Sequence, residues 1–183
     1  MRSLSEIALT TRLTLFADRQ AFDALVRQHQ GAVRRFFLHL TLGDTMLSDD
    51  LAQDTFLKAW LHLDQYSGRA SFQTWLFSIG LNTWRDHLRS QHLTEDIDDY
   101  NETFNPSENR FESNDRDVGL RMDMLRALKQ LKPIERTCVT LQVIENQKIE
   151  EIARITELNA NTVKSHIMRG KQKLAEYLSN NGY

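Results

Sequence analysis

The hydrophobic residues in the first half of the chain recur every three or four positions, which is the period of a helix with one buried face. One helix is predicted from Ala21 through Phe37. The next is predicted to begin at Ser48, because this hydroxyl precedes two Asp carboxylates and both groups suit a helix N-terminus. Its apolar stripe comprises Ala52, Phe56, Ala59, Trp60 and Leu63. Both patterns favour helices over strands.

A third helix is predicted over residues 72–89, with Ser71 as its N-cap and the polar loop 66–70 before it. Aromatic residues are frequent in this helix, namely Phe72, Trp75, Phe77 and Trp84. Of these, Trp75 and Trp84 are expected mainly to fill the core of the domain.

The second half of the chain continues the helical pattern. One helix is marked by an apolar stripe of Met122, Leu125, Leu128 and Leu131. Pro133 suits the first turn of the next helix, where its missing N–H costs nothing, and residues 145–147 close that helix. Two shorter helices are predicted at residues 149–156 and 159–177. With only 7 Gly and 2 Pro in the chain, the predicted fold class is all-α.

Charge divides the chain into parts. The net charge of the 183 residues is −2, but residues 91–117 hold nine acidic and two basic side chains and so carry −7, which leaves +5 for the rest. This stretch contains Pro106 and few aliphatic residues. It is therefore predicted to be a flexible acidic linker between a helical domain at residues 1–90 and another at residues 118–183. A solvated tether is the simplest role for it, and the alternatives are shielding of a basic surface of the chain and passage through a basic channel of a partner.

Several classes of function find no support in the residues. The single cysteine, Cys138, lies in an apolar run and is expected to be a buried thiol, not a redox sensor. No stretch approaches the ~20 apolar residues that span a bilayer, and no signal peptide is evident, so a cytoplasmic protein without membrane insertion is expected. The six His lack a His-Glu-x-x-His spacing, and no glycine-rich phosphate loop or nucleophile motif occurs. No catalytic residue, metal or cofactor is therefore predicted.

Residues 149–167 have the form of a helix-turn-helix. The small side chain of Ala153 lets a second helix cross close to the first. The core between the two helices is predicted to contain Ile152, Leu158, Val163 and Ile167. Asn159 and Asn161 are suited to cap the second helix. Glu157 occupies the turn and is predicted to adopt a positive φ, at a cost of about 1 kcal/mol.

The outer face of the second helix carries hydrogen-bonding side chains where a recognition helix needs them in the DNA major groove. These residues are Asn161, Thr162, Lys164, Ser165, His166 and Arg169. Lys171 and Lys173 follow as predicted phosphate contacts. A helical hairpin with a solvated basic face is the alternative. The small residue, the turn, the caps and the basic face together favour DNA binding.

With these motifs the chain resembles the extracytoplasmic-function (ECF) group of bacterial RNA polymerase sigma factors, which have two helical domains, region 2 and region 4. In region 2 the resemblance rests on residues 48–60 and 72–82, with Asp86 and Arg89. In region 4 it rests on residues 131–136 and on the helix-turn-helix. The resemblance implies that the chain binds core RNA polymerase and directs it to promoters, with no catalysis of its own.

The resemblance also implies partners. Residues 50–60 would bind the coiled coil of the polymerase β′ clamp, since carboxylates beside one apolar anchor suit a basic partner helix. The contact residues would be Asp50, Gln53, Asp54 and Leu57. A solvated acidic helix start is the alternative for this face. The C-terminal domain would bind the −35 promoter element and the polymerase β flap. An anti-sigma protein, which restrains many members of the group, is a further candidate partner.

Recognition of the −10 promoter element is expected from the loop and the third helix. The residues implied are Tyr66, Ser67, Gly68, Arg69, Trp75, Asn82, Arg85 and Arg89. Tyr66 would stack on a flipped base beside Asn82, and such stacking contributes about 1–3 kcal/mol per base. Trp75 would brace the melted strand. Arg85 and Arg89, one helical turn apart, would hold phosphates, and on the plainer interpretation they are only exposed charges.

A transcriptional regulator that never binds polymerase is the nearest rival hypothesis, because it could use the same helix-turn-helix. Such a protein would not need the blocks at residues 50–60 and 66–82 together. An enzyme is the third hypothesis, and the missing catalytic motifs count against it.

Overall fold

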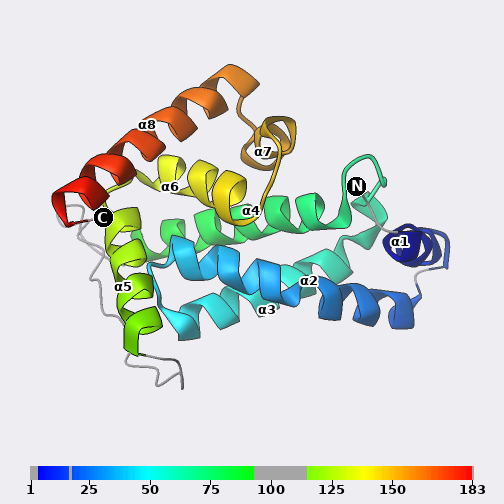
Figure 1. Cartoon of the computed structure of the whole chain (residues 1–183). Coiled ribbons are helices and arrows are strands. Elements are labelled where there is room, and N and C mark those ends of the chain that lie inside the picture. Colours follow the sequence, from blue (N-terminus) through cyan, green and yellow to red (C-terminus); the bar gives the residue numbers. More distant parts are fainter. Residues whose placement is uncertain (1–3, 17, 93–114, 183) are drawn as a thin grey trace. The chain divides into compact units, whose positions relative to one another are not determined.

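The computed structural model describes residues 4–16, 18–92 and 115–182, and every regular element in those ranges is helical (Figure 1). The elements are α1 (Leu4–Phe16), α2 (Arg19–Leu40), α3 (Thr45–Leu61), the 3-10 turn η1 (Leu63–Gln65), α4 (Phe72–His92), α5 (Asp115–Lys129), α6 (Pro133–Val139), the π-helical turn η2 (Thr140–Ile144), α7 (Ile149–Thr156) and α8 (Ala160–Asn180). The prediction of an all-α fold is confirmed. The N-terminal helix α1 was not among the predicted helices.

Contacts divide the chain into two compact units. The first unit comprises Met1–Arg35 and Asp49–Asn101, and the second comprises Phe36–Ser48 and Glu102–Tyr183. Most of the predicted acidic linker, residues 93–114, lies outside the described residues. At its edges, α4 extends to His92 and α5 begins at Asp115. The domain limits inferred from charge stay a prediction.

The core of the first unit is built on aromatic rings. Phe72 is fully buried at the start of α4, and its ring centroid lies 6.4 Å from that of Phe22, 5.4 Å from that of Tyr66 and 5.5 Å from that of Trp75. Tilted and edge-to-face ring pairs of this kind are more favourable than face-to-face sandwiches. Farther along α4, Trp84 is also buried, as predicted. The aromatic positions of α4 therefore serve mainly the fold.

Caps fix where α3 and α4 begin. Ser71 is the N-cap of α4, as predicted, because its Oγ accepts the backbone N–H of Thr74 at 3.0 Å. Ser48 was predicted to be the N-cap of the helix before α4, and this prediction is wrong. That helix, α3, begins at Thr45, and Oδ1 of Asp44 accepts the N–H of Leu47 at 2.9 Å. Ser48 lies inside the first turns of α3, buried, and its hydroxyl donates to the carbonyl of Asp44.

The second unit packs α5, α6, α7 and α8 together. Leu128, Leu131 and Val139 form a buried apolar cluster with Leu42, and Leu174 of α8 covers it. Pro133 opens α6, as predicted. These contacts tie the end of α5 to α6 and α8.

A buried guanidinium donates hydrogen bonds to backbone carbonyl oxygens at helix ends in this unit. Arg136 is 3% exposed and donates to the carbonyl oxygens of Leu128 at 3.2 Å, Leu40 at 2.9 Å and Leu131 at 3.5 Å. Carbonyl groups at helix C-termini lack partners within their own helix, so a positive group is favourable there. Arg136 therefore satisfies backbone acceptors that the core would otherwise leave without partners.

The thiol of Cys138 is buried, as predicted. Its residue is 0% exposed on α6, and burial raises the pKa of the Cys138 thiol to about 11. A thiol with so high a pKa holds little reactive thiolate at neutral pH. These properties suit a core residue.

Candidate functional site

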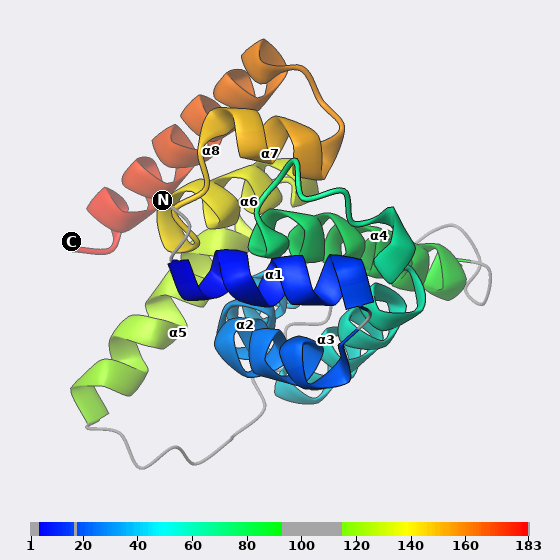
Figure 2. The ribbon, with the colours of Figure 1, turned by 90° about the vertical axis from the view of Figure 1, so that its right-hand side faces the viewer.

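The turn between α7 and α8 is built as the sequence predicted. Helix α7 ends at Thr156, and Glu157 follows with φ of 62° in the left-handed region. Asn159 then caps α8, and its Oδ1 accepts the N–H of Thr162 at 2.8 Å. Asn161 lies within the helix, where its carbonyl accepts the hydroxyl of Ser165 at 3.0 Å, so the second predicted cap is not one. The turn places α7 beside α8, as both views show (Figure 1 and Figure 2).

A small core holds the two helices of this motif. Ile152 and Val163 are fully buried, and Ile167 is 6% exposed. Leu158 is only half-buried, whereas Ile155, which was not among the predicted core residues, is 1% exposed. The apolar face of α7 therefore turns toward α8, and the predicted helix-turn-helix is confirmed.

Helix α8 also crosses close to α6 at a glycine. A Cβ built on Gly170 would lie 2.6 Å from Cγ2 of Val139, a distance that real side chains do not tolerate. Gly170 is itself buried, and the residues of α8 on the opposite side are left free of the core. The buried row of α8 thus decides which residues face outward.

The outward face of α8 carries the residues predicted to bind DNA. Asn161, Lys164, Arg169 and Lys171 are exposed, and Thr162, Ser165 and His166 are half-buried. Nδ1 of His166 is buried and has no hydrogen-bond partner among the described residues. The four exposed residues therefore offer the most accessible hydrogen-bonding groups on this face. The structure brings all seven onto one helix.

Lys173, predicted to contact phosphate, forms an ion pair with α6. Its Nζ donates to Oε2 of Glu135 at 2.7 Å. Burial raises the pKa of the Glu135 carboxyl, yet the bonds from Lys173 and from the backbone N–H of Lys132 outweigh this effect, and the pKa falls below its ordinary value. Lys173 thus supports the packing of α8 on α6, and its predicted phosphate contact stays a prediction.

Sequence reasoning missed one residue of the outward face. Met168 lies on it and is 65% exposed. A signal was present, because Met168 stands three residues after Ser165 and four after Lys164, on the same side of the helix.

A second candidate surface lies on α3. All four residues predicted to bind the polymerase clamp are exposed there, namely Asp50, Gln53, Asp54 and Leu57. Ala59 is fully buried and Ala52 nearly so, which confirms that the two sets use different faces of the helix. Trp60, predicted to be part of the apolar stripe, is 37% exposed. The outward face of α3 therefore combines carboxylates with large apolar groups.

The loop between α3 and α4 presents fewer of the predicted groups. Ser67 and Arg69 are exposed, and Gly68 has φ of 71°. Tyr66, predicted to stack on a base, is only 5% exposed, and its hydroxyl donates to the carbonyl of Ala70 at 3.2 Å. Its ring packs against Phe72 and Trp75 instead. In this structure the ring of Tyr66 is part of the core, because two aromatic neighbours on α4 enclose it.

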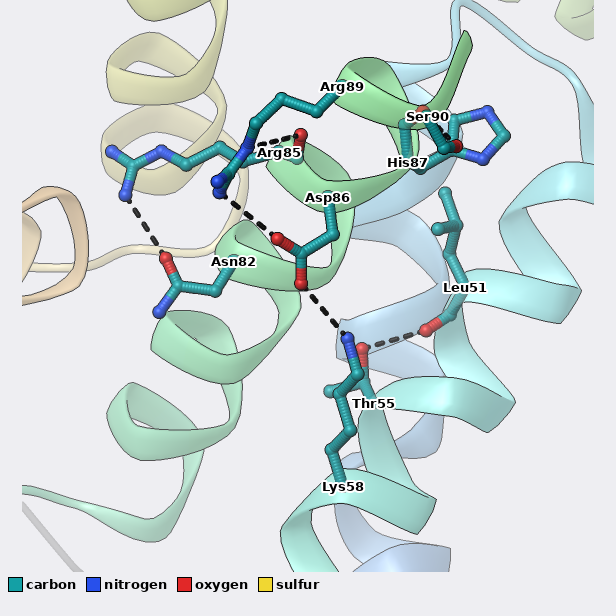
Figure 3. A network of polar contacts seen from close by, with 9 residues as sticks. All are labelled: Leu51, Thr55, Lys58, Asn82, Arg85, Asp86, His87, Arg89 and Ser90. Atoms are coloured by element: carbon teal, nitrogen blue, oxygen red, sulfur yellow. Dashed lines mark hydrogen bonds and ion pairs between the residues drawn. The ribbon is translucent and has the colours of Figure 1, made fainter. Parts of the chain in front are cut away.

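A polar network connects α3 with α4 (Figure 3). Asp86 accepts from Nζ of Lys58 at 3.4 Å and from Nη2 of Arg89 at 3.0 Å. One turn earlier, Nη1 of Arg85 donates to Oδ1 of Asn82 at 3.1 Å. Exposed pairs of this kind contribute little to stability. They do hold the cationic groups of Lys58, Arg85 and Arg89 on one surface. The predicted residues Asn82, Arg85 and Arg89 are thus brought together.

Residues 4–16, 18–92 and 115–182 contain no group of three or more His, Cys, Asp or Glu placed to hold a metal ion. Nor is any helix in the described part of the chain both long and apolar enough to cross a membrane.

Two family models match the chain. The model of sigma-70 region 2 matches residues 25–94, and the model of sigma-70, region 4 matches residues 121–174. The first match covers the exposed face of α3 and the network on α4. The second covers the helix-turn-helix.

Known proteins resemble the chain along most of its length. The RNA polymerase sigma factor CarQ of Myxococcus xanthus is 31% identical over 160 residues, which are 87% of this chain and 90% of that protein. The ECF RNA polymerase sigma-E factor of Escherichia coli (strain K12) is 30% identical over 172 residues, 86% of both chains. Among solved structures, CnrH in complex with the cytosolic domain of CnrY is similar with a TM-score of 0.72 and 26% identity, over 97% of this chain and 99% of that chain.

Proposed function

Because the chain belongs to the ECF group of RNA polymerase sigma factors, we propose that it reads promoters with separate surfaces of its two units. Members of this family are transcription initiation factors and not enzymes, and the chain directs RNA polymerase to promoters. The observation that carries the proposal is the outward face of α8, where polar and cationic side chains stand opposite a fully buried row. Residues 1–90 would act as region 2 and residues 118–183 as region 4, in the cytoplasm.

The outward face of α8 is assigned to the −35 element. Asn161, Lys164, Ser165 and Arg169 are placed to reach base edges, because the first turns of a recognition helix enter the major groove. Lys171 lies farther along the helix, where it would hold a phosphate. Thr162 and His166 border this surface and are half-buried.

Single truncations test this assignment. Lys164→Ala or Arg169→Ala should weaken promoter binding by about 1–3 kcal/mol and alter the preferred sequence if the side chain touches bases. Lys171→Ala should weaken binding to all sequences alike and flatten the salt dependence, since a phosphate contact releases counterions. Arg126→Ala removes an exposed cation from α5 and serves as the control. If none of the three α8 variants differs from this control, α8 is not the recognition helix.

The exposed face of α3 is assigned to the polymerase. A carboxylate pair, Asp50 and Asp54, precedes the exposed Leu57 on the same face of α3, and such a surface complements a basic coiled coil like that of the β′ clamp. Asp54→Arg combined with Leu57→Ala should abolish retention of core polymerase in a pull-down. The fold should persist, because both side chains are exposed. Asp23→Arg, a charge reversal on α2, is the matched control, and equal retention by both variants would contradict the assignment.

The loop and α4 are assigned to the −10 element. Arg85 and Arg89 would hold phosphates of the melted strand, with Asn82, Ser67 and Arg69 beside them. The rings of Tyr66 and Trp75 pack together, with their centroids 5.0 Å apart, so a base would stack on Tyr66 only after its ring leaves this packing. Arg85→Ala and Arg89→Ala should reduce the permanganate reactivity of −10 thymines while leaving the −35 footprint intact.

Two further protein partners complete the proposal. The polymerase β flap would bind the second unit, which places this unit at the −35 element within the complex. An anti-sigma protein would hold the free factor inactive; this follows the example of CnrH, whose structure was solved in complex with the cytosolic domain of CnrY. Such a protein should copurify with the free chain and be displaced by core polymerase.

One experiment tests the function as a whole. Core polymerase should transcribe a distinct subset of a mixed promoter library only when this chain is added, and the shared −10 and −35 sequences define its specificity. If the chain binds DNA but no template responds with core polymerase present, it is an ordinary regulator and the proposal fails.

A further inference from the structure

A single large apolar side chain interrupts the polar outward face of α8. Met168 is 65% exposed, and on this helix, which lies wholly within the described residues, it is the only large hydrophobic residue that is exposed. The residues around it are polar or charged, with Lys164 one turn before it and Arg169 directly after it. Scattered surface hydrophobic residues are common, so exposure alone does not assign a role. The position of Met168 on the helix does.

Helical geometry places Met168 on the side that faces DNA. Val163, Ile167 and Gly170 are buried and define the inner side of α8. At about 100° per residue, Met168 lies well over a quarter turn from the mean direction of this row, on the side that Asn161 and Ser165 share. The residues 161, 164, 165 and 168 follow the spacing i, i+3, i+4, i+7, which is the spacing that a homeodomain helix uses to contact bases. Met168 is therefore within the set that reaches the groove floor.

The chemistry of the groove supplies a matching group. Among the base edges in the major groove, the 5-methyl of thymine is the apolar one, and apolar side chains recognise it. A thioether is flexible and polarisable and adapts its packing to a methyl group. Against a cytosine amino group, Met168 would cover a donor without replacing its hydrogen bond, which costs free energy. The side chain therefore discriminates in favour of thymine.

We infer that Met168 is a specificity-determining residue that packs on the 5-methyl group of a thymine in the −35 element. The inference rests on the proposed role of α8 as the recognition helix. It adds a base preference that the polar residues do not supply. Because the contact is apolar, it releases no counterion and leaves the salt dependence of binding unchanged.

The test removes the methyl group and the side chain in turn. The preferred −35 sequence is first selected with the full-length chain bound to core polymerase. Each thymine of that element, on either strand, is then replaced by deoxyuridine, which lacks only the methyl. At one position this change should weaken binding of the wild type by about fourfold, the value expected for one methyl-sized group returned to water. The same change should not affect Met168→Ala.

Control variants separate this contact from other effects. Met168→Leu keeps an apolar side chain and should keep most of the sensitivity to deoxyuridine. Met124→Ala, which removes a partly exposed methionine from α5, should behave as wild type. The slope of log Kd against log salt should be the same for Met168→Ala and for wild type, and smaller for Lys171→Ala.

The remaining outcomes overturn the inference. A selected element without thymine, a wild type indifferent to every deoxyuridine, or a Met168→Ala variant that keeps the sensitivity would each show that Met168 reads no methyl group. If Lys164→Ala and Arg169→Ala still alter sequence preference in those cases, α8 remains the recognition helix and only the inference fails. If neither does, the assignment of α8 fails with it.

Discussion

Gly170 occupies the point where α8 passes closest to α6. An added Cβ would stand 2.6 Å from Cγ2 of Val139 and 3.6 Å from the carbonyl oxygen of Glu135. We expect Gly170→Ala to lower the free energy of unfolding of the second unit by about 1–3 kcal/mol, because overpacking forces neighbouring side chains from their preferred rotamers. Thermal unfolding followed by circular dichroism measures this loss.

A glycine on another helix provides the control for this substitution. A Cβ at Gly119 in α5 would meet nothing within 4 Å. Gly119→Ala should therefore stabilise α5, by up to about 1 kcal/mol, since alanine has the higher helix propensity. Equal effects of the two alanine substitutions would contradict the close packing at Gly170.

The ion pair of the buried Glu135 with Lys173 makes stability depend on pH. The pKa of the Glu135 carboxyl is lowered in the folded chain from its ordinary 4.5, so the ionised form stabilises the fold. This contribution is complete above the unfolded pKa and is lost as the pH falls through the lower folded value. In urea unfolding, the difference between wild type and Glu135→Gln should be constant near neutral pH and shrink below about pH 4.5.

The exposed Glu150 serves as the comparison for that experiment. Glu150→Gln should change stability little, because this side chain is exposed in the folded chain. A difference for Glu135→Gln that persists unchanged at low pH would mean that its ionisation is not coupled to folding.

At the scale of elements, the start of α8 depends on one cap. Asn159 accepts the N–H of Thr162 at 2.8 Å. We expect Asn159→Ala to cost about 1 kcal/mol in unfolding free energy, whereas Asn159→Asp should cost little, because a carboxylate also suits a helix N-terminus. Asn161→Ala should cost less than Asn159→Ala, since Asn161 lies inside the helix. Chemical denaturation of the three variants checks this order.

Local signals explain which elements could be predicted from the sequence. Pro133 marks a helix start by its fixed backbone and Asn159 by its capping side chain, and α7 has the predicted limits Ile149–Thr156. The start of α3 was misplaced because Asp44 and Ser48 are both good caps one turn apart, and local rules do not choose between them.

Helix α1 was missed for a different reason. Its apolar residues do not gather on one face, so the helical period is weak in the sequence. Only packing against the rest of the chain determines such a helix. An element of this kind cannot be recognised by periodicity.

At the scale of the whole molecule, the residue types at the candidate sites could be predicted, but not what encloses them. Lys173 and Glu135 are 38 positions apart, so their pairing depends on the packing of α8 on α6. The burial of Tyr66 likewise depends on rings of α4. Exposed faces such as that of Asp50 and Asp54 were predicted well, because a solvated helix side requires no distant partner.

The rate at which a reagent labels the single thiol of the chain reports how often the second unit opens. Cys138 is fully buried and is the only cysteine, so a thiol reagent reacts only when the surrounding helices open. The ratio of the labelling rate to that of an unfolded peptide then gives the free energy of opening. Gly170→Ala should shorten the labelling half-life, and a bound −35 duplex should lengthen it. The fold thus contains its own reporter of ligand binding, with no dye or added cysteine required.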